Sequence, residues 1–247
     1  MLIAGASSGV GKAIAVRFAA EGWDVCLNAR RESALLEIQQ SLPNGDHLVC
    51  SGNITDPSVV DAVRHAIDDS WGKLDALVYS VGVYAPVDPI SDPLDKWRQV
   101  FDVLVNGAVY LTRMAVPLMQ TGGRIIFITS IHGERAIAGA SSYSTAKAAL
   151  NQYARALAID LAPAGILVNA IAPGFLSHPV GRPEGVNDVA TIEFQRKRQD
   201  YIQQHVPLRR AAQPEEIAGV AFFLAGGDAS YITGQVIVVD GGLTVWL

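Results

Sequence analysis

Several residue patterns that mark particular classes of protein are scarce or absent in this chain. Its 247 residues include 2 cysteines, too few for a disulfide framework. No apolar run is long enough to cross a membrane as a helix, and no cysteine and histidine cluster has the spacing of metal ligands. Charged residues make up 17% of the chain and the net charge is -5, so no basic surface is offered to nucleic acid or to a membrane. We therefore expect no metal, nucleic acid or membrane as a partner.

The residues that are present favour one large globular domain. Hydrophobic residues make up 50% of the chain, which is typical of a protein with a large core. Cys26 and Cys50 lie in strand-like apolar runs, where we expect reduced, buried thiols. The chain opens on a strand and a glycine-rich turn without a signal-peptide pattern, so we expect a cytoplasmic protein. We predict a single dinucleotide-binding and catalytic domain over residues 1–247.

Strand-like and helix-like segments alternate along the chain. This alternation predicts an α/β fold, a single Rossmann-like doubly wound parallel sheet with helices on both faces and a ligand crevice at the carboxyl ends of the strands. The segment 176–206 contains prolines, glycines and mixed charges, and we predict that it forms a mobile substrate lid rather than core. The predicted strands are 1–4, 23–29, 47–50, 74–81, 125–130, 167–172 and 235–239, and the predicted helices are 12–22, 33–42, 59–71, 94–120, 143–161 and 214–225. Asp56, before Pro57, is a predicted helix cap.

A glycine-rich turn joins the first predicted strand to the first predicted helix. Glycines allow the backbone to approach a pyrophosphate, and the free N–H groups and dipole of a helix start stabilise its charge. A tight structural turn is the alternative, but the place of this turn in an α/β chain is the one that a phosphate site requires. We predict that the cofactor is bound here by Gly5, Ser7, Ser8, Gly9, Val10 and Gly11.

The end of the second predicted strand indicates which cofactor is used. A site for NAD places an acidic residue there to bind the ribose 2′-hydroxyl, whereas this chain has Ala29. Arg30 follows and is well placed to bind a 2′-phosphate. Arg30 and Arg31 also precede a helix, where its dipole disfavours cations, and an anionic ligand would offset that cost. The alternative is that both are surface charges. We predict NADP(H) as the cofactor.

A tyrosine and a lysine four residues apart follow the fifth predicted strand. On a helix, Tyr143 and Lys147 lie one turn apart on the same face. At about 4 Å and an effective dielectric of about 20, an ammonium favours a phenolate by roughly 4 kcal/mol, or about three pKa units. Such a tyrosine can exchange a proton at neutral pH. Ser130 ends the strand and could contact the same substrate oxygen. The alternative is a buried tyrosine near a surface lysine, since this spacing is common by chance. We predict Ser130, Tyr143 and Lys147 as catalytic residues.

Several motifs agree in order and spacing with one family, over essentially the full chain. They are Gly5-x-x-x-Gly9-x-Gly11, Ser130 before Tyr143-x-x-x-Lys147, Val168-Asn169 before Pro173-Gly174, and Tyr231-Ile-Thr-Gly234 before Asp240-Gly241-Gly242. In these residues the chain resembles the short-chain dehydrogenase/reductase family. Extended members of that family and Rossmann methyltransferases fit less well, because of the glycine spacing, the Tyr/Lys pair and the short chain.

The resemblance implies a reaction and a role for each residue. Tyr143 would be the acid in ketone reduction or the base in alcohol oxidation, Lys147 would tune it and hold the nicotinamide ribose, and Ser130 would orient the carbonyl. Hydride would pass between nicotinamide C4 and the substrate carbon. The family also implies a homo-oligomer, a tetramer or dimer, through the predicted helices 94–120 and 143–161. Further cofactor contacts are expected at Asn53, Ile54, Gly82, Pro173 and Gly174.

The chain also departs from the family pattern. Family members usually have Asn-Asn-Ala-Gly where this chain has Tyr79-Ser80-Val81-Gly82, and a threonine where it has His178. An ungapped alignment of the helix 94–120 places Leu104 where the family has a fourth catalytic residue, an asparagine. Asn106 lies about 200° further round a helix, so it would not face the same way. In the family that asparagine helps to hold a water that links the lysine to solvent, and leucine cannot bind it.

Two functions remain open at this point. The first is an oxidoreductase that transfers a hydride between NADP(H) and a small carbonyl or alcohol, most simply a ketone reductase, and the intact Ser130, Tyr143 and Lys147 favour it. The second is a non-catalytic or weakly active dinucleotide-binding member of the family, acting as a sensor or an oligomer partner, which Leu104, Tyr79 and His178 favour. His132 and His178 are candidate substrate contacts, although a structural role is at least as common for a lone histidine.

Overall fold

The computed structural model describes residues 1–83, 90–177 and 189–245. Within these residues, seven parallel strands form one sheet in the order β3-β2-β1-β4-β5-β6-β7. The chain steps outward from β1 in one direction and then returns to continue from β4 in the other, which confirms the predicted doubly wound sheet. The strands are β1 (Leu2–Ala4), β2 (Cys26–Ala29), β3 (Leu48–Ser51), β4 (Ala76–Tyr79), β5 (Arg124–Ile128), β6 (Leu167–Pro173) and β7 (Val236–Val239).

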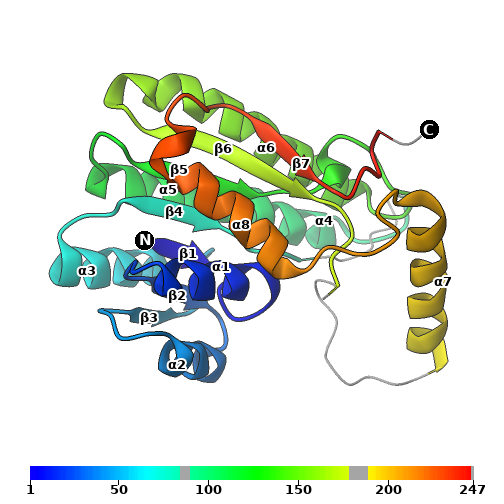
Figure 1. Ribbon diagram of the computed structural model, residues 1–247, viewed down its shortest axis with the longest axis horizontal. Coiled ribbons are helices and arrows are strands. Elements are labelled where there is room, and N and C mark those ends of the chain that lie inside the picture. The colour runs from blue at the N-terminus through cyan, green and yellow to red at the C-terminus, as the bar shows by residue number, and fades with distance from the viewer. Residues whose placement is uncertain (84–89, 178–188, 246–247) are drawn as a thin grey trace.

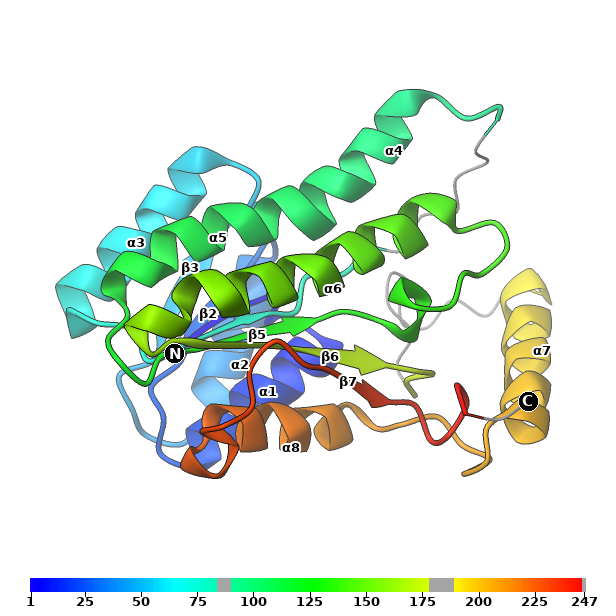
Figure 2. The same cartoon turned by 90° about the horizontal axis from the view of Figure 1, so that it is seen from above.

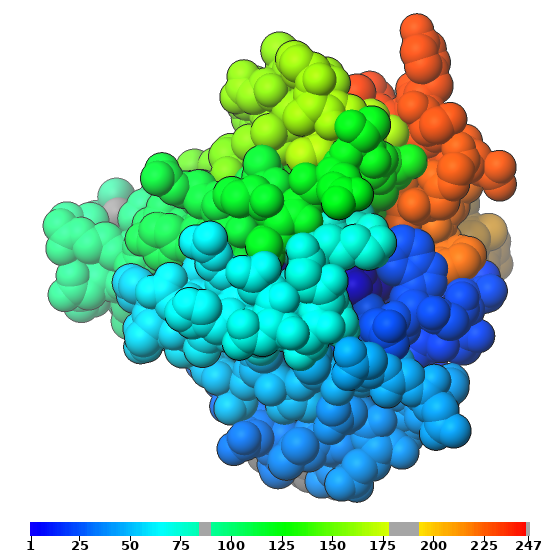
Figure 3. All heavy atoms as spheres, turned by 90° about the vertical axis from the view of Figure 1, so that its left-hand side faces the viewer, coloured from blue at the N-terminus to red at the C-terminus, as the bar shows by residue number. Residues whose placement is uncertain are grey.

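Helices cover both faces of this sheet, as Figures 1 and 2 show. One face carries α1 (Gly9–Ala20), α2 (Glu32–Ser41) and α8 (Pro214–Ala225), and the other carries α3 (Pro57–Trp71), α5 (Gly107–Ala115) and α6 (Ser141–Leu161). Each layer encloses its own buried cluster, so the parallel strands are covered on both sides by apolar side chains. Seen from the amino ends of the strands, α3 lies between α5 and the first strand–helix unit (Figure 3).

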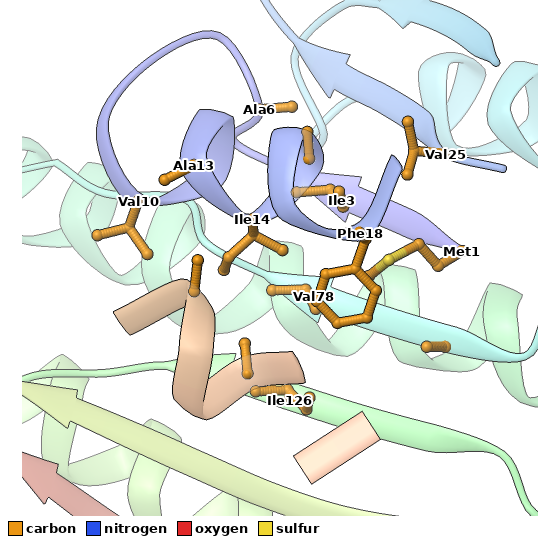
Figure 4. Packing of buried hydrophobic residues seen from close by; sticks show 14 of the residues in the cluster. Met1, Ile3, Ala6, Val10, Ala13, Ile14, Phe18, Val25, Val78 and Ile126 are labelled. Carbon is orange, nitrogen blue, oxygen red and sulfur yellow. The ribbon is translucent and has the colours of Figure 1, made fainter. Parts of the chain in front are cut away.

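Helix α1 packs against the sheet, and this contact positions the start of the helix at the carboxyl ends of the strands. Ile14 and Phe18 of α1 point towards Val78 of β4 and Ile126 of β5 (Figure 4). Phe18 also meets the ring of Phe222 on α8 edge to face, with centroids 5.2 Å apart. Burial of each such side chain stabilises the fold by about 1.5–3 kcal/mol. The glycine-rich turn is thereby held at the crevice between β1 and β4.

Local sequence explains why α3 begins and ends where it does. Asp56 accepts a hydrogen bond from the backbone N–H of Ser58, and Pro57 occupies the first helical position, where a missing N–H costs nothing. Gly72 ends the helix in the left-handed conformation, with φ of 62°. The cap predicted at Asp56 is confirmed, and the helix begins at Pro57, slightly before the predicted start.

The predicted helix 94–120 is helical without a break from Leu94 to Leu118, but it is not an α-helix throughout. It consists of α4 (Leu94–Phe101), a π-helical turn η1 (Asp102–Asn106), α5 and a short 3₁₀ turn (Val116–Leu118). The widened turn lies where the helix crosses Tyr79, whose hydroxyl donates to the carbonyl of Val103 inside the turn. A Cβ at Gly107 would come within 2.4 Å of that hydroxyl, so the close crossing needs a glycine.

The predicted lid 176–206 contains a helix that the sequence analysis did not foresee. Helix α7 (Val189–His205) lies at the carboxyl ends of the strands, at the edge of the molecule in both ribbon views (Figures 1 and 2). Part of the segment belongs to the core and not to a lid, because Ile202 of α7 and the following Val206 are buried. The predicted substrate residue His178 lies outside the described residues.

Both cysteines carry free thiols, as expected, although only one is a core residue. Cys26 on β2 is fully buried, whereas Cys50 on β3 is half-buried, and their sulfur atoms are 3.6 Å apart. No helix in the described part of the chain is long and apolar enough to cross a membrane.

Candidate active site

One cleft at the carboxyl ends of the strands brings together the residues that the sequence analysis selected. It lies where the strand order reverses, between the ends of β1 and β4, the usual ligand position in such sheets. Within the described residues, every predicted site residue lines this cleft; His178 lies outside them. The lining residues among the predictions are Gly5, Ser7, Ser8, Gly9, Val10, Gly11, Arg30, Asn53, Ile54, Gly82, Ser130, His132, Tyr143, Lys147, Pro173 and Gly174.

The glycine-rich turn is shaped by its glycines and opens onto the cleft. Gly5 has a φ of 84°, and a Cβ there would meet the carbonyl oxygen of Ser80 at 2.5 Å. A Cβ at Gly11 would meet the carbonyl oxygen of Gly5 at 2.2 Å. Ser8 caps α1 in an extended conformation without a side-chain hydrogen bond to the helix. The first N–H groups of α1 are therefore not capped by that side chain, and they suit an anionic group such as a phosphate.

The end of β2 offers a cation and no carboxylate to the cleft. Arg30 is exposed in the cleft wall beside Ala29, and within the described residues no hydrogen bond or ion pair engages its guanidinium. Across the cleft, Asn53 accepts a hydrogen bond from the backbone N–H of Thr55 through Oδ1 at 3.3 Å. Its amide nitrogen remains a donor. These groups can bind an anionic ribose substituent and a hydrogen-bond acceptor, respectively.

Helix α6 holds Tyr143 and Lys147 one turn apart, as predicted. Lys147 is buried, its ammonium donates to the carbonyl oxygen of Ile128 at 2.9 Å, and its Nζ lies 5.8 Å from the centre of the Tyr143 ring. A protonated lysine about 6 Å from a phenolate favours it by roughly 3 kcal/mol at an effective dielectric of about 20. Burial also lowers the pKa of Lys147 to about 7. Lys147 can therefore gain or lose a proton near neutral pH.

Ser130 lies just beyond β5, at the start of a short 3₁₀ turn, η3 (Ile131–Gly133). Its Oγ accepts a hydrogen bond from the backbone N–H of His132 at 3.1 Å. This bond uses a lone pair and leaves the hydroxyl proton available, so Ser130 can still donate to an oxygen atom in the cleft. Ser130 and Tyr143 thus supply two hydroxyl groups to one region of the cleft.

His132 is the second residue of that turn, and its ring lies edge-on to Tyr143. The two ring centres are 6.3 Å apart with an interplanar angle of 69°. Nδ1 of His132 lies 3.2 Å from the carbonyl oxygen of Arg135. Burial lowers the pKa of His132 below its usual value, although the contact with the Arg135 carbonyl works in the opposite direction. The imidazole is therefore neutral at pH 7.

Leu104 and Tyr79 are two of the positions at which the chain departs from the family pattern, and both are buried. Leu104 is fully buried in the π-helical turn and packs in one cluster with Val100, Ala146 and the ring of Tyr143. It does not line the cleft. Asn106 donates to the carboxylate of Asp102 at 2.7 Å and does not take its place, as expected. Tyr79 is also fully buried, and burial raises its pKa well above the ordinary value.

One wall of the cleft is aromatic, and its residues were not predicted from the sequence. Tyr201 on α7 contacts Phe175 edge to face at 5.7 Å, and the Arg198 guanidinium lies 5.4 Å from the centre of the Phe175 ring. All three line the cleft. No sequence signal marked them, because their meeting depends on where α7 packs. The described residues contain no group of three or more histidine, cysteine or acidic side chains placed to hold a metal ion.

Comparisons with known proteins agree with this geometry. Residues 5–244 match the family model described as enoyl-(acyl carrier protein) reductase. The chain is 32% identical over 245 residues to meso-2,3-butanediol dehydrogenase of Serratia marcescens, with 99% of this chain and 94% of that protein covered. The chain belongs to the short-chain dehydrogenase/reductase family.

Two further relatives extend the comparison. A 3-oxoacyl-(acyl-carrier-protein) reductase of Synechocystis is 34% identical over 251 residues, which cover 99% of this chain and 96% of that protein. The crystal structure of L-sorbose reductase from Gluconobacter frateurii, complexed with NADPH and L-sorbose, matches with a TM-score of 0.90 and 32% identity. It covers 100% of this chain and 96% of that one. These short-chain dehydrogenase/reductase relatives make the present protein an oxidoreductase that acts on a small substrate.

Proposed function

We propose that the protein is an NADP(H)-dependent oxidoreductase that reduces a small ketone and, in reverse, oxidises the corresponding alcohol. One observation carries the proposal: Ser130, Tyr143 and Lys147 line the same cleft as the glycine-rich turn. A proton donor and a dinucleotide site are the two parts that such a reaction needs in one place.

The residues present fit a bound NADP(H) molecule. The turn at Gly5 and Gly11 has no room for side chains, and the start of α1 offers uncapped N–H groups to a pyrophosphate. Arg30, with Ala29 in place of an acidic residue, favours a 2′-phosphate over a free 2′-hydroxyl. The relative crystallised with NADPH supports the same choice. When bound, the cofactor would supply or accept the hydride.

The protein's own side chains would handle the proton. In the reductive direction the phenol of Tyr143 donates its proton to the carbonyl oxygen while Ser130 donates a hydrogen bond to the same atom. Protonated Lys147 stabilises the phenolate that forms, because Nζ lies 5.8 Å from the ring centre. In the oxidative direction the same phenolate would accept the proton of the alcohol.

We also propose that the protein is a cytoplasmic homo-oligomer, a tetramer or dimer assembled through α5 and α6. Apolar side chains on the outer surface of these helices support this, since Tyr110 is 40% exposed and Ile159 is 76% exposed. Light scattering of the purified protein tests the assembly. A monomer at micromolar concentration would contradict it.

A second function has one specific observation in its favour. Leu104 belongs to the apolar cluster against which Tyr143 packs, and its side chain has no polar group that could hold a water for proton supply. A protein with this change could bind the dinucleotide without turnover and act as a sensor or an oligomer partner. Fold alone does not decide between the two functions.

A measurement of turnover distinguishes the two functions. NADPH consumption should be measured against a panel of ketones and quinones. Tyr143→Phe keeps the ring and removes the proton, so turnover should fall by about 10²-fold or more while cofactor binding changes little. Tyr153→Phe on the same helix is the matched control, because Tyr153 does not line the cleft. Tight NADPH binding without turnover of any substrate would favour the second function. Near-full activity of Tyr143→Phe would mean that another group supplies the proton.

A further inference from the structure

The turn that follows β5 couples His132 to the catalytic serine. The backbone N–H of His132 donates to Oγ of Ser130 at 3.1 Å, which fixes where the turn leaves the strand. The imidazole then lies beside Tyr143, with ring centres 6.3 Å apart. Ser130, His132 and Tyr143 all line the cleft. The histidine is therefore a neighbour of any substrate that contacts the two hydroxyl groups.

The contact with Arg135 determines which nitrogen of His132 carries the proton. Nδ1 lies 3.2 Å from the carbonyl oxygen of Arg135, and a carbonyl oxygen can only accept a hydrogen bond. Nδ1 must therefore be the donor. The ring is neutral at pH 7 because burial lowers its pKa, so Nε2 is left with a lone pair. Within the described residues Nε2 has no hydrogen-bond partner and is not among the buried unpartnered atoms, so it is exposed to solvent on a residue that lines the cleft.

Tyr143, Ser130 and His132 therefore have different hydrogen-bonding roles. Tyr143 and Ser130 donate, which suits a carbonyl oxygen. Nε2 of His132 accepts, so it needs a donor on the substrate. We propose that Nε2 of His132 accepts a hydrogen bond from a hydroxyl group on the carbon next to the reacting carbonyl, which makes α-hydroxy ketones the substrate class and vicinal diols the products. This inference rests on the proposed function, because it assigns the substrate of the same site.

The closeness of the two rings bears on the position of that hydroxyl. The reacting oxygen must lie within hydrogen-bond distance of the Tyr143 phenol, and the His132 ring is centred 6.3 Å from the phenol ring. The carbon next to the carbonyl is the nearest one that can carry a donor, so we assign the hydroxyl to that carbon. A substrate without a donor leaves Nε2 desolvated and unpaired, which costs transition-state binding.

Three ketones of similar size test the proposal on the unmodified protein. Hydroxyacetone has the hydroxyl, methoxyacetone has the same oxygen without a proton to donate, and butan-2-one replaces the hydroxyl by a methyl group. Methoxyacetone is the essential comparison, because its oxygen also activates the neighbouring carbonyl. We expect kcat/KM to be about tenfold or more higher for hydroxyacetone than for methoxyacetone, mainly through KM.

Two variants separate the two ring nitrogens. In His132→Asn the amide nitrogen can replace Nδ1 as donor to Arg135, but nothing replaces Nε2. In His132→Gln the longer side chain can place an amide oxygen near the Nε2 position. The ratio of kcat/KM for hydroxyacetone over methoxyacetone should fall to about one in His132→Asn and stay clearly above one in His132→Gln. Use of a ratio cancels any general loss of activity, and NADPH binding shows that each variant is folded.

The possible outcomes are distinct. Equal kcat/KM for hydroxyacetone and methoxyacetone in the unmodified protein would overturn the inference and leave the proposed function intact. A high ratio that is unchanged in His132→Asn would also overturn it, since the hydroxyl would then be recognised elsewhere. Absence of turnover with all three ketones and with the wider panel would overturn the proposed function, and the inference with it.

Discussion

The hydroxyl of Tyr79 donates a hydrogen bond to the carbonyl oxygen of Val103 and so joins strand β4 to the π-helical turn η1. The ring is fully buried, and Gly107 makes room for it. Val103 lines the cleft, and its neighbour Leu104 belongs to the buried cluster against which Tyr143 packs. The contact therefore connects the central sheet to a turn that borders the proposed proton donor, Tyr143. It also gives a carbonyl of the widened turn a partner.

Removal of this hydroxyl should destabilise the fold. Tyr79→Phe keeps the ring but leaves the carbonyl of Val103 without this partner, so we expect a loss of about 0.5–1.5 kcal/mol in the free energy of unfolding. Urea denaturation of both proteins measures it. Tyr110→Phe is the matched control, because Tyr110 is exposed on α5 and should change stability little. If the two variants are equally stable, the bond to Val103 contributes nothing to the fold.

Arg30 should determine the preference for NADPH over NADH. Arg30→Ala removes a charge-assisted hydrogen bond to the 2′-phosphate, so affinity for NADPH should fall by about 1.5–3 kcal/mol while affinity for NADH stays almost unchanged. Fluorescence titration with each cofactor measures this. Arg155→Ala is a control for loss of a positive charge, because Arg155 is exposed on α6 and does not line the cleft. Equal affinities for the two cofactors in the unmodified protein would rule out this role of Arg30.

Leu104→Asn tests whether proton supply limits turnover. If the relay is broken, an asparagine that can hold a water should raise the rate at neutral pH, and the solvent isotope effect should be larger in the parent than in the variant. The substitution also buries an amide and removes apolar packing, so stability should fall by about 2–4 kcal/mol. Rates must therefore be compared at a temperature where both proteins are folded. An unchanged or lower rate, with equal isotope effects, would show that the missing asparagine does not limit this enzyme.

Lys147 should make the stability depend on pH in a particular direction. Burial lowers its pKa from 10.5 to about 7, so between these values the unfolded chain binds a proton that the folded protein does not. The parent therefore loses stability as pH falls from about 10.5 to about 7 and shows no further effect of this group below that. Over the same pH range the free energy of unfolding of Lys147→Met should rise relative to that of the parent. At pH 7 the difference should be on the order of 4 kcal/mol, before the loss of the hydrogen bond to Ile128 is counted.

Denaturation at pH 7 and at pH 10 measures that difference. Lys73→Met provides the control, because Lys73 is exposed and pairs with Asp75 at the surface. Its difference from the parent should be small at both values of pH. A difference for Lys147→Met that does not change between pH 7 and pH 10 would mean that the buried ammonium keeps an ordinary pKa in the folded protein.

The sequence predicted the parts of the fold and site that depend on neighbouring residues. The glycine-rich turn, the cap at Asp56 and the spacing of Tyr143 and Lys147 are local patterns with local physical causes. The π-helical turn could not be predicted in this way, because it depends on contact with Tyr79, more than twenty residues earlier in the chain. Helix α7 was missed because its apolar residues form only a weak stripe and glycines and prolines precede it. The tautomer of His132 depends on the Arg135 carbonyl, which only the folded turn brings close.

The bond between His132 and Ser130 has a consequence for protein engineering. It is formed by the backbone of His132, not by its imidazole. Any amino acid except proline can therefore occupy position 132 and still donate to the serine hydroxyl. A mutant library at this one codon would change which group faces the substrate while the hydroxyl of Ser130, the proposed catalytic serine, keeps its hydrogen bond. Substrate preference could then evolve by single substitutions on a constant reaction centre.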